Sequence, residues 1–276
     1  MRMAWTAAGL TALLWVAAAG ARDVPYVPTP MDVVEEMLEL AEIGPDSVLY
    51  DLGSGDGRIV ISAAKDYGAR AVGIDIDPNR IDESWENARV AGVTDQVEFI
   101  EGNLFDLDLS EADAVTLYLL STVNIKLRPK LLRELAPGTP VVSHAFDMGE
   151  WEPDEVRHVQ GRVVYFWRVP AEVSGVWRVA ARGEEGPLAF DLRLDQVFQE
   201  VHGEAEIDGV LVPLEAVRLD GDRLSFTVTA PGAHVYEFSG TVAGEDMVGA
   251  ARPRGTDQDT LHWSGRASSR GASLAQ

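Results

Sequence analysis

Apolar and polar residues follow one another along the first 170 positions in blocks that predict β-strands and α-helices in turn. Short apolar runs bounded by turn residues are typical of strands, and apolar residues spaced three and four apart are typical of helices. The predicted strands are 48–50, 71–75, 97–100, 114–120 and 140–143, followed by a hairpin of 156–160 with 162–168. Because strands and helices alternate, we expect a mostly parallel sheet covered by helices on both faces.

The first helix has a clear start signal. Thr29 is a residue of the type that caps a helix, Pro30 suits the first helical position, and Asp32 suits the first turn. Gly44 and Pro45 are expected to end this helix. The later helices are predicted over 58–67, from Pro78 to Gly92, and after the fourth strand as far as Leu135.

After the hairpin the pattern changes to that of an all-β domain over 171–266. Leu188, Phe190, Leu192 and Leu194 alternate with polar or small residues, and Asp-Gly pairs mark turns between apolar runs. About eight short strands are expected, closed into an antiparallel barrel or packed as a sandwich. The small and polar residues 267–276 predict a disordered tail.

The N-terminal segment 1–21 is expected to lie outside the folded domains. Residues 3–21 are almost wholly apolar or small, and Ala19-Gly20-Ala21 fits the pattern at which a signal peptide is cleaved. An uncleaved membrane anchor is the competing interpretation, because about 19 apolar residues nearly span a bilayer. In either case the first folded domain is expected over 22–170.

Composition narrows the classes of partner. The formal net charge is −22, so a nucleic-acid backbone is disfavoured, whereas a basic protein would be attracted. The chain has no cysteine, which excludes disulfides, zinc–thiolate sites and thiol nucleophiles. Its five histidines have no metal-ligand spacing, so no metal site is expected.

The segment Asp51-Leu52-Gly53-Ser54-Gly55-Asp56-Gly57-Arg58 follows the first predicted strand and precedes a helix. This is the order that brings a glycine-rich turn against a nucleotide-like ligand. The third glycine of the dinucleotide pattern is replaced by Arg58, which disfavours an NAD oxidoreductase. Two carboxylates, Asp51 and Asp56, suit a cationic or hydroxyl-rich ligand better than a pyrophosphate.

S-adenosylmethionine is a ligand with these properties, because it carries a sulfonium, an amino group and a ribose diol. Asp51 is expected to face its cationic end, and the backbone of Gly53 and Gly55 to approach its methionine part. Asp75 lies at the end of the second strand, where an acid can accept both ribose hydroxyls. Beyond the third strand, Asn103 and Leu104 are expected at the adenine, although Asn103 is also a common turn residue. Asp77 is a weaker candidate for the ribose, because it also suits the N-cap of the next helix.

The motifs together resemble those of class I methyltransferases. The segments Pro25–Pro30, Asp51–Val60, Leu127–Leu131 and Val141–His144 are similar to those of archaeal broad-specificity protein-lysine methyltransferases and of the mitochondrial enzymes that modify the c-ring of the ATP synthase. The resemblance covers about residues 24–170. It implies a Rossmann-like seven-stranded sheet, S-adenosylmethionine as cofactor and transfer of methyl to a protein lysine, and it leaves the all-β domain without a function.

Two residues are candidates for a catalytic role, Tyr26 before the first helix and His144 at the end of the fifth strand. Tyr26 can wall the site or only pack the first helix, and a lone histidine is more often structural. The methyl acceptor is expected to enter beside residues 119–124. Methyl transfer mainly requires that the amine be aligned, deprotonated and shielded from water.

Two other functions remain open at this point. A signal-like N-terminus places the chain in the cell envelope or periplasm, whereas S-adenosylmethionine is made in the cytoplasm, so an exported and inactive binding protein is one alternative. The other is a methyltransferase of small molecules, in which the β domain would hold an apolar ligand within a barrel.

Overall fold

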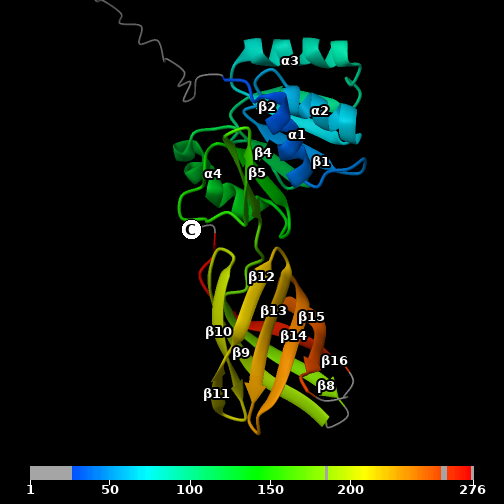
Figure 1. Cartoon of the computed structure of the whole chain (residues 1–276). Helices are drawn as coiled ribbons and strands as arrows, with labels where there is room; N and C mark the ends of the chain where they lie inside the picture. The colour runs from blue at the N-terminus through cyan, green and yellow to red at the C-terminus, as the bar shows by residue number, and fades with distance from the viewer. Residues whose placement is uncertain (1–26, 184–185, 256–259, 275–276) are drawn as a thin grey trace, which may run out of the picture.

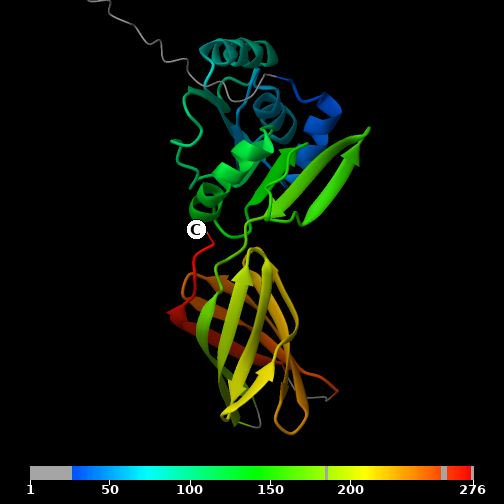
Figure 2. The same cartoon turned by 90° about the vertical axis from the view of Figure 1, so that its left-hand side faces the viewer.

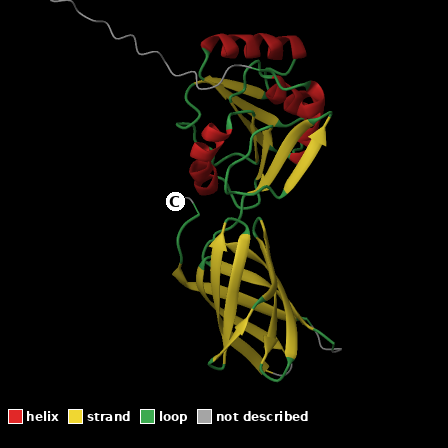
Figure 3. Cartoon of the chain, turned by 60° about the vertical axis from the view of Figure 1, so that its left-hand side comes forward, coloured by secondary structure: helices red, strands yellow, loops and turns green. Residues whose placement is uncertain are grey.

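The computed structural model describes residues 27–183, 186–255 and 260–274 (Figure 1). An α/β unit is followed in the chain by a β-barrel, and all helices among the described residues belong to the α/β unit (Figure 3). The predicted signal or anchor segment and Tyr26 lie outside the described residues. No helix within the described ranges is long and apolar enough to cross a membrane.

The α/β unit contains a seven-stranded sheet of order β3-β2-β1-β4-β5-β7-β6. β1 to β5 are parallel, and β7 and β6 add an antiparallel hairpin at one edge. The strands are β1 Val48–Leu52, β2 Arg70–Asp75, β3 Val97–Glu101, β4 Ala114–Leu117, β5 Pro140–His144, β6 Glu155–Val159 and β7 Arg162–Arg168. This arrangement confirms the predicted Rossmann-like sheet.

Helices cover both faces of the sheet, as predicted. Apolar residues of α1 (Met31–Leu40), α2 (Arg58–Tyr67) and α3 (Pro78–Ala91) form one buried cluster with β1, β2 and β3. Apolar residues of α4 (Ser121–Glu134) form a second cluster on the other face, together with Trp151 and Trp167. The strand ends are therefore held from two sides, which fixes the positions of the residues that follow each strand.

The second unit is a barrel made by one antiparallel sheet (Figure 2). The sheet has nine strands in the order β11-β10-β9-β8-β16-β15-β14-β13-β12. The strands are β8 Gly175–Gly183, β9 Gly186–Val197, β10 Glu200–Ile207, β11 Val210–Pro213, β12 Glu215–Asp220, β13 Arg223–Ala230, β14 His234–Ala243, β15 Asp246–Pro253 and β16 Leu261–Arg270. Of the two architectures expected for this domain, an antiparallel barrel or a sandwich, the chain forms the barrel.

The strands β11 and β12 behave as one bent strand. Only Leu214 separates them, and because every neighbouring pair in the sheet is antiparallel, the two strands run in the same direction. The chain pairs with β10 as far as Pro213 and then crosses to pair with β13. This crossing brings the two edges of the sheet together, and it reconciles nine assigned strands with the eight that were expected.

Side chains fill the inside of the barrel. Phe226 and Phe238 stack with ring centroids 4.9 Å apart, and Trp263 packs edge-on against Phe238 at 5.7 Å. These three rings are at most 3% exposed, so they are packed among other side chains. Because the rings occupy the interior, the structure gives no support to an apolar ligand held inside the barrel.

The last strand continues beyond residue 266, where the β domain was expected to end. β16 runs to Arg270, whose guanidinium lies 4.8 Å from the centre of the Trp177 ring and donates to Glu172 O at 2.8 Å. Beyond the strand, Leu274 N donates to the Glu172 carboxylate at 3.0 Å. These contacts order the described part of the segment that composition alone predicted to be disordered.

The close approach of β14 and β15 gives a test of barrel packing. A Cβ at Gly249 would lie 2.0 Å from Ser239 O, whereas a Cβ at Gly265 would make ordinary contacts at 3.5 Å. We expect Gly249→Ala to lower the free energy of unfolding by about 1–3 kcal/mol, because the two strands must separate. The matched variant Gly265→Ala should leave it within about 0.5 kcal/mol, measured by urea unfolding; equal effects of the two substitutions would contradict this packing.

Candidate functional site

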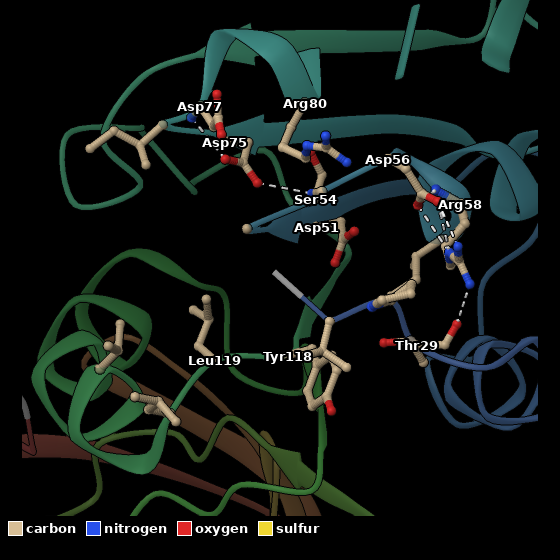
Figure 4. Close-up of a pocket in the computed structure, with 18 of the residues that line it drawn as sticks. Thr29, Asp51, Ser54, Asp56, Arg58, Asp75, Asp77, Arg80, Tyr118 and Leu119 are labelled. Carbon is tan, nitrogen blue, oxygen red and sulfur yellow. Dashed lines mark hydrogen bonds and ion pairs between the residues drawn. The ribbon is translucent and has the colours of Figure 1, made fainter. Parts of the chain in front are cut away.

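A cavity of about 550 Å³ lies at the carboxyl ends of β1, β2 and β4, where parallel sheets of this kind bind their ligands (Figure 4). The segment before α1, the turn after β1, the end of β2, the start of α4 and Phe146 surround it. The polar lining residues are Thr29, Asp51, Ser54, Asp56, Arg58, Asp75, Asp77, Arg80 and Tyr118. Four of these side chains are carboxylates, so acids dominate the polar lining.

The backbone amides of the β1–α2 turn are already used by the protein. Gly53 N and Ser54 N donate to Ile74 O at 2.8 and 3.0 Å, and Gly55 N donates to Asp75 Oδ2 at 2.9 Å. The amides of Gly57 and Arg58 donate to acceptors within the turn, Ser54 O at 2.9 Å and Asp56 Oδ1 at 3.3 Å. A phosphate-binding turn points such amides at its ligand, so this turn is not built for a phosphate.

Glycine is required in the turn for conformation and for space. Gly53 and Gly57 have φ of 87° and 79°, in the left-handed region. A Cβ at Gly53 would lie 2.8 Å from Leu119 Cδ2, and a Cβ at Gly57 would lie 2.7 Å from the Phe99 ring. Glycine is therefore favoured at both positions by the left-handed conformation, and at Gly57 also by the close Phe99 ring.

Asp75 links the end of β2 to the turn after β1. Its Oδ2 accepts from Gly55 N and its Oδ1 from Asp77 N, both at 2.9 Å. These two bonds fix the carboxylate at the cavity wall and leave lone pairs for a ligand. Asp77 caps α3 by accepting from Asn79 N at 3.1 Å, as the sequence indicated.

Asp51 is a buried acid at the floor of the cavity. It is 2% exposed and accepts a hydrogen bond from Thr116 Oγ1 at 2.8 Å. Burial raises the pKa of Asp51 from 3.8 to about 7, and the nearby charges of Asp75 and Asp56 add to this, against the lowering effect of the Thr116 bond. Because the folded-state pKa lies above that of an exposed carboxyl, this group's contribution to stability is lost as the pH rises from about 4 to about 7.

Arg58, which replaces the third glycine, attaches the turn to the segment before α1. Its guanidinium pairs with Asp56 at 2.6 Å and donates to Thr29 O at 2.8 Å (Figure 4). The predicted N-cap role of Thr29 is wrong, because Pro30 is the N-cap residue and has no side-chain cap bond. Thr29 Oγ1 instead lies 3.4 Å from His144 Nδ1, so Thr29 belongs to the site.

Three aromatic rings form one side of the site. Tyr118 lies with its ring centroid 4.0 Å from that of His144 and 6.0 Å from that of Phe146. Tyr118 and Phe146 line the cavity, whereas His144 lies behind them and is 3% exposed. Burial, followed by the charge of Arg162, lowers the pKa of His144 to about 4, and Asp32 only partly opposes this. His144 is therefore neutral near pH 7 and a weak base, which favours packing over acceptance of a proton from the amine.

The structure brings together four of the six residues that were predicted to bind the cofactor. Asp51, Gly53, Gly55 and Asp75 line one cavity, together with Leu119, Leu120 and Val123 from the expected acceptor side.

The predicted adenine contacts lie apart from that cavity. Asn103 Oδ1 accepts from Phe105 N at 3.2 Å, as a turn residue does, and Leu104 packs against the buried cluster beside α4. Neither residue lines the cavity, so their adenine contact stays a prediction. Tyr26 lies outside the described residues, and His144 contacts the cavity-lining residues Tyr118 and Thr29.

Sequence analysis did not identify Tyr118, Phe146 and Thr29 as site residues. The signal for Tyr118 and Phe146 was their position at or just after the ends of β4 and β5, where side chains reach the ligand edge of a parallel sheet.

No group of three or more His, Asp or Glu residues in the described ranges is arranged to hold a metal ion.

Known methyltransferases are similar in sequence to the first half of this chain. Residues 51–155 match the family model described as the ANTKMT methyltransferase domain. A protein-lysine N-methyltransferase of Saccharolobus islandicus is 51% identical over 138 residues, which are 50% of this chain and 86% of that protein. The adenine nucleotide translocase lysine N-methyltransferase of Mus musculus is 36% identical over 132 residues, which are 48% of this chain but only 57% of that protein.

A solved structure is also similar. The crystal structure described as an RNA methyltransferase from Salinibacter ruber, in complex with S-adenosyl-L-homocysteine, is 59% identical with a TM-score of 0.52. The match covers 53% of this chain and 96% of that one. High identity over nearly whole relatives, together with the shared fold and motifs, identifies this chain as a member of the protein-lysine N-methyltransferase family of class I, S-adenosylmethionine-dependent methyltransferases.

Proposed function

We propose that this protein transfers a methyl group from S-adenosylmethionine to the ε-amine of lysine in a protein substrate. One observation carries the proposal: the cavity presents acids, and the amides of its glycine turn are occupied by protein acceptors. Such a site suits a cationic donor rather than a phosphate ligand.

The residues present fit the donor. Asp75 is held by two amides with its carboxylate at the cavity wall, which suits the ribose hydroxyls. Asp51, at the floor of the cavity, can face the positive charge of the methionine end. Gly53 and Gly55 have no side chain, so the backbone of the turn can come close to the bound donor. When bound, S-adenosylmethionine supplies a methyl group that its sulfonium has already activated.

The acceptor side suits the side chain of lysine. Tyr118, Phe146 and the apolar residues at the start of α4 give a wall on which the four-carbon stem of lysine can pack. Burial there disfavours the charged ammonium, which promotes loss of the proton that the nucleophile must shed. A ring face also stabilises the methylated, cationic product by a cation–π contact.

Other acceptors and functions receive less support. An RNA substrate, which the description of the Salinibacter structure suggests for that protein, is opposed by the net charge of −22 and by the acids of the cavity. A small apolar molecule inside the barrel is opposed by its packed aromatic interior. The alternative of an exported binding protein without catalysis is supported only by the signal-like sequence of residues 1–21.

Transfer of labelled methyl from S-adenosylmethionine to basic proteins, with lysine sites assigned by mass spectrometry, tests the function. We expect label on lysine and none on RNA. In the same assay, Tyr118→Ala should raise the acceptor KM roughly tenfold, because the lysine stem loses its wall, while Tyr118→Phe retains most of the activity. Label confined to RNA or to solvent-extractable material would overturn the proposed acceptor.

The donor site is tested through Asp75. Replacing it with alanine should weaken S-adenosylmethionine binding roughly 10- to 100-fold in calorimetry, because a charged acceptor is lost and Gly55 N loses its partner. The control is Asp82→Ala, which removes an exposed acid of α3 that does not line the cavity. If both variants bind the donor like the parent protein, Asp75 is not part of its site.

The raised pKa of Asp51 predicts a pH dependence of donor binding. Below about pH 7 the carboxyl is protonated and attracts a cation less, so S-adenosylmethionine affinity should rise up to about tenfold between pH 6 and pH 8. Asp51→Asn should abolish this rise and, without ligand at pH 8, raise the melting temperature, because an ionised buried group is removed. Unchanged pH dependence in the variant would show that another group is responsible.

A further inference from the structure

One segment connects the cavity with the barrel. Residues 145–154, here named the strap, follow β5 at the cavity and run along α4 to the start of β6 at the opposite edge of the sheet. The strap carries Phe146 into the cavity wall at one end. At its other end Trp151 packs against the barrel residue Phe198.

The strap contains no helix or named strand, and besides an isolated bridge between Met148 and Trp151 its carbonyl groups are held largely by side chains. Asn124 Nδ2 donates to the carbonyls of Phe146 and Asp147 at 3.1 and 3.3 Å, and Arg128 donates to Met148 O at 2.9 Å. Trp167 Nε1 donates to Trp151 O at 2.8 Å. The barrel adds another bond, because Gln199 Nε2 donates to Glu152 O at 2.7 Å.

The ring of Trp151 depends on packing. Trp151 is fully buried, and its indole N–H has no hydrogen-bond partner among the described residues. Its neighbours are Trp167 and Phe198, each with ring centroids 6.0 Å away, and the Phe198 ring is nearly parallel to it at 19°. Phe198 therefore supplies one of the two aromatic contacts that hold this ring in place.

Phe198 also contacts α4 directly. The guanidinium of Arg128 lies 5.0 Å from the centre of the Phe198 ring, within the range of a cation–π contact. Since Arg128 also holds Met148 O, one residue of the barrel touches both the strap and the side chain that fixes its middle.

The backbone of Phe198 is constrained for this purpose. Its φ is 53°, a left-handed conformation that a bulky residue adopts only where the surroundings impose it. The Gln196 side chain fastens this turn, because its Nε2 donates to Phe198 O at 2.7 Å and to Ala171 O at 2.8 Å. Its Oε1 accepts from Val173 N at 2.7 Å, so the turn between β9 and β10 is tied to the linker between the two units.

From these contacts we propose that Phe198 is a positioning residue for methyl transfer, by which the barrel holds the strap and so fixes Phe146 on the acceptor side of the cavity. The acceptor part of this inference rests on the proposed function. Donor-binding residues lie on the β1 and β2 side, away from the strap, so loss of Phe198 affects the acceptor and spares the donor.

The full chain with Phe198→Ala tests the proposal by two independent measurements. We expect faster amide hydrogen exchange within residues 145–152, and an acceptor KM raised roughly five- to tenfold with S-adenosylmethionine affinity unchanged within about twofold. Phe198→Tyr keeps the ring and should restore both properties. Hydrogen exchange and donor affinity remain measurable if the parent protein methylates no lysine, so failure of the proposed function is recognised separately.

Two matched variants separate positioning from general damage. Val197→Ala changes the exposed residue just before Phe198, at the end of β9, and should behave like the parent protein. Phe190→Ala removes a ring from the barrel interior and should lower barrel stability without raising exchange in the strap. Three outcomes would overturn the proposal: unchanged exchange in Phe198→Ala, faster exchange with an unchanged acceptor KM, or the same acceptor defect in Phe190→Ala.

Discussion

The hydrogen bond between Gly55 N and the Asp75 carboxylate is the contact on which the site depends. It joins the turn after β1 to the end of β2, and through its second oxygen Asp75 also holds Asp77 N at the start of α3. By occupying an amide that could otherwise bind a phosphate, this bond changes the electrostatic character of a common nucleotide-binding turn. A cavity rich in carboxylates follows, and with it a preference for a positively charged ligand.

Such a cavity has a cost in stability. Asp51 is buried beside other acids, and its pKa is raised to about 7. An acid in this position opposes folding above that pH, and a cation bound nearby relieves the opposition. The arrangement is typical of functional sites, where groups that serve binding are held in surroundings that do not favour them. Thr116 offsets part of the cost through its hydrogen bond.

The barrel is more than an appended module, because it contacts the α/β unit at several places. Arg168, at the end of β7, pairs with Asp220 of β12 at 3.3 Å, and Ala171 N donates to Gly221 O at 2.9 Å. Phe198 and Gln199 of the barrel also contact the strap. Together these contacts join the barrel to the sheet at the edge opposite the cavity. Its interior is filled by rings, so its outer surface and turns are what it offers to the rest of the molecule.

Local sequence determined the elements and much of the donor side. Strand and helix periods are short-range, and the glycine turn of 51–58 requires residues that only a sharp turn against a ligand would need. Asp51, Gly53, Gly55 and Asp75 could be named because each lies at or just after the end of a predictable strand. Arg58 stands where the dinucleotide-binding pattern has its third glycine, which the sequence shows directly. Its bond to Thr29 O joins residues that no local pattern relates.

Only the tertiary structure decided the acceptor side and the place of the barrel. Tyr118, His144 and Phe146 meet because β4 and β5 lie side by side, and sequence spacing does not predict how their rings face one another. Thr29 was expected to cap a helix, yet its hydroxyl lies beside His144, and Pro30 is the N-cap residue of a helix that begins at Met31. Phe198 reaches Trp151 from another unit of the chain, and such a contact is fixed by packing over the whole molecule, which the order of residues alone does not reveal.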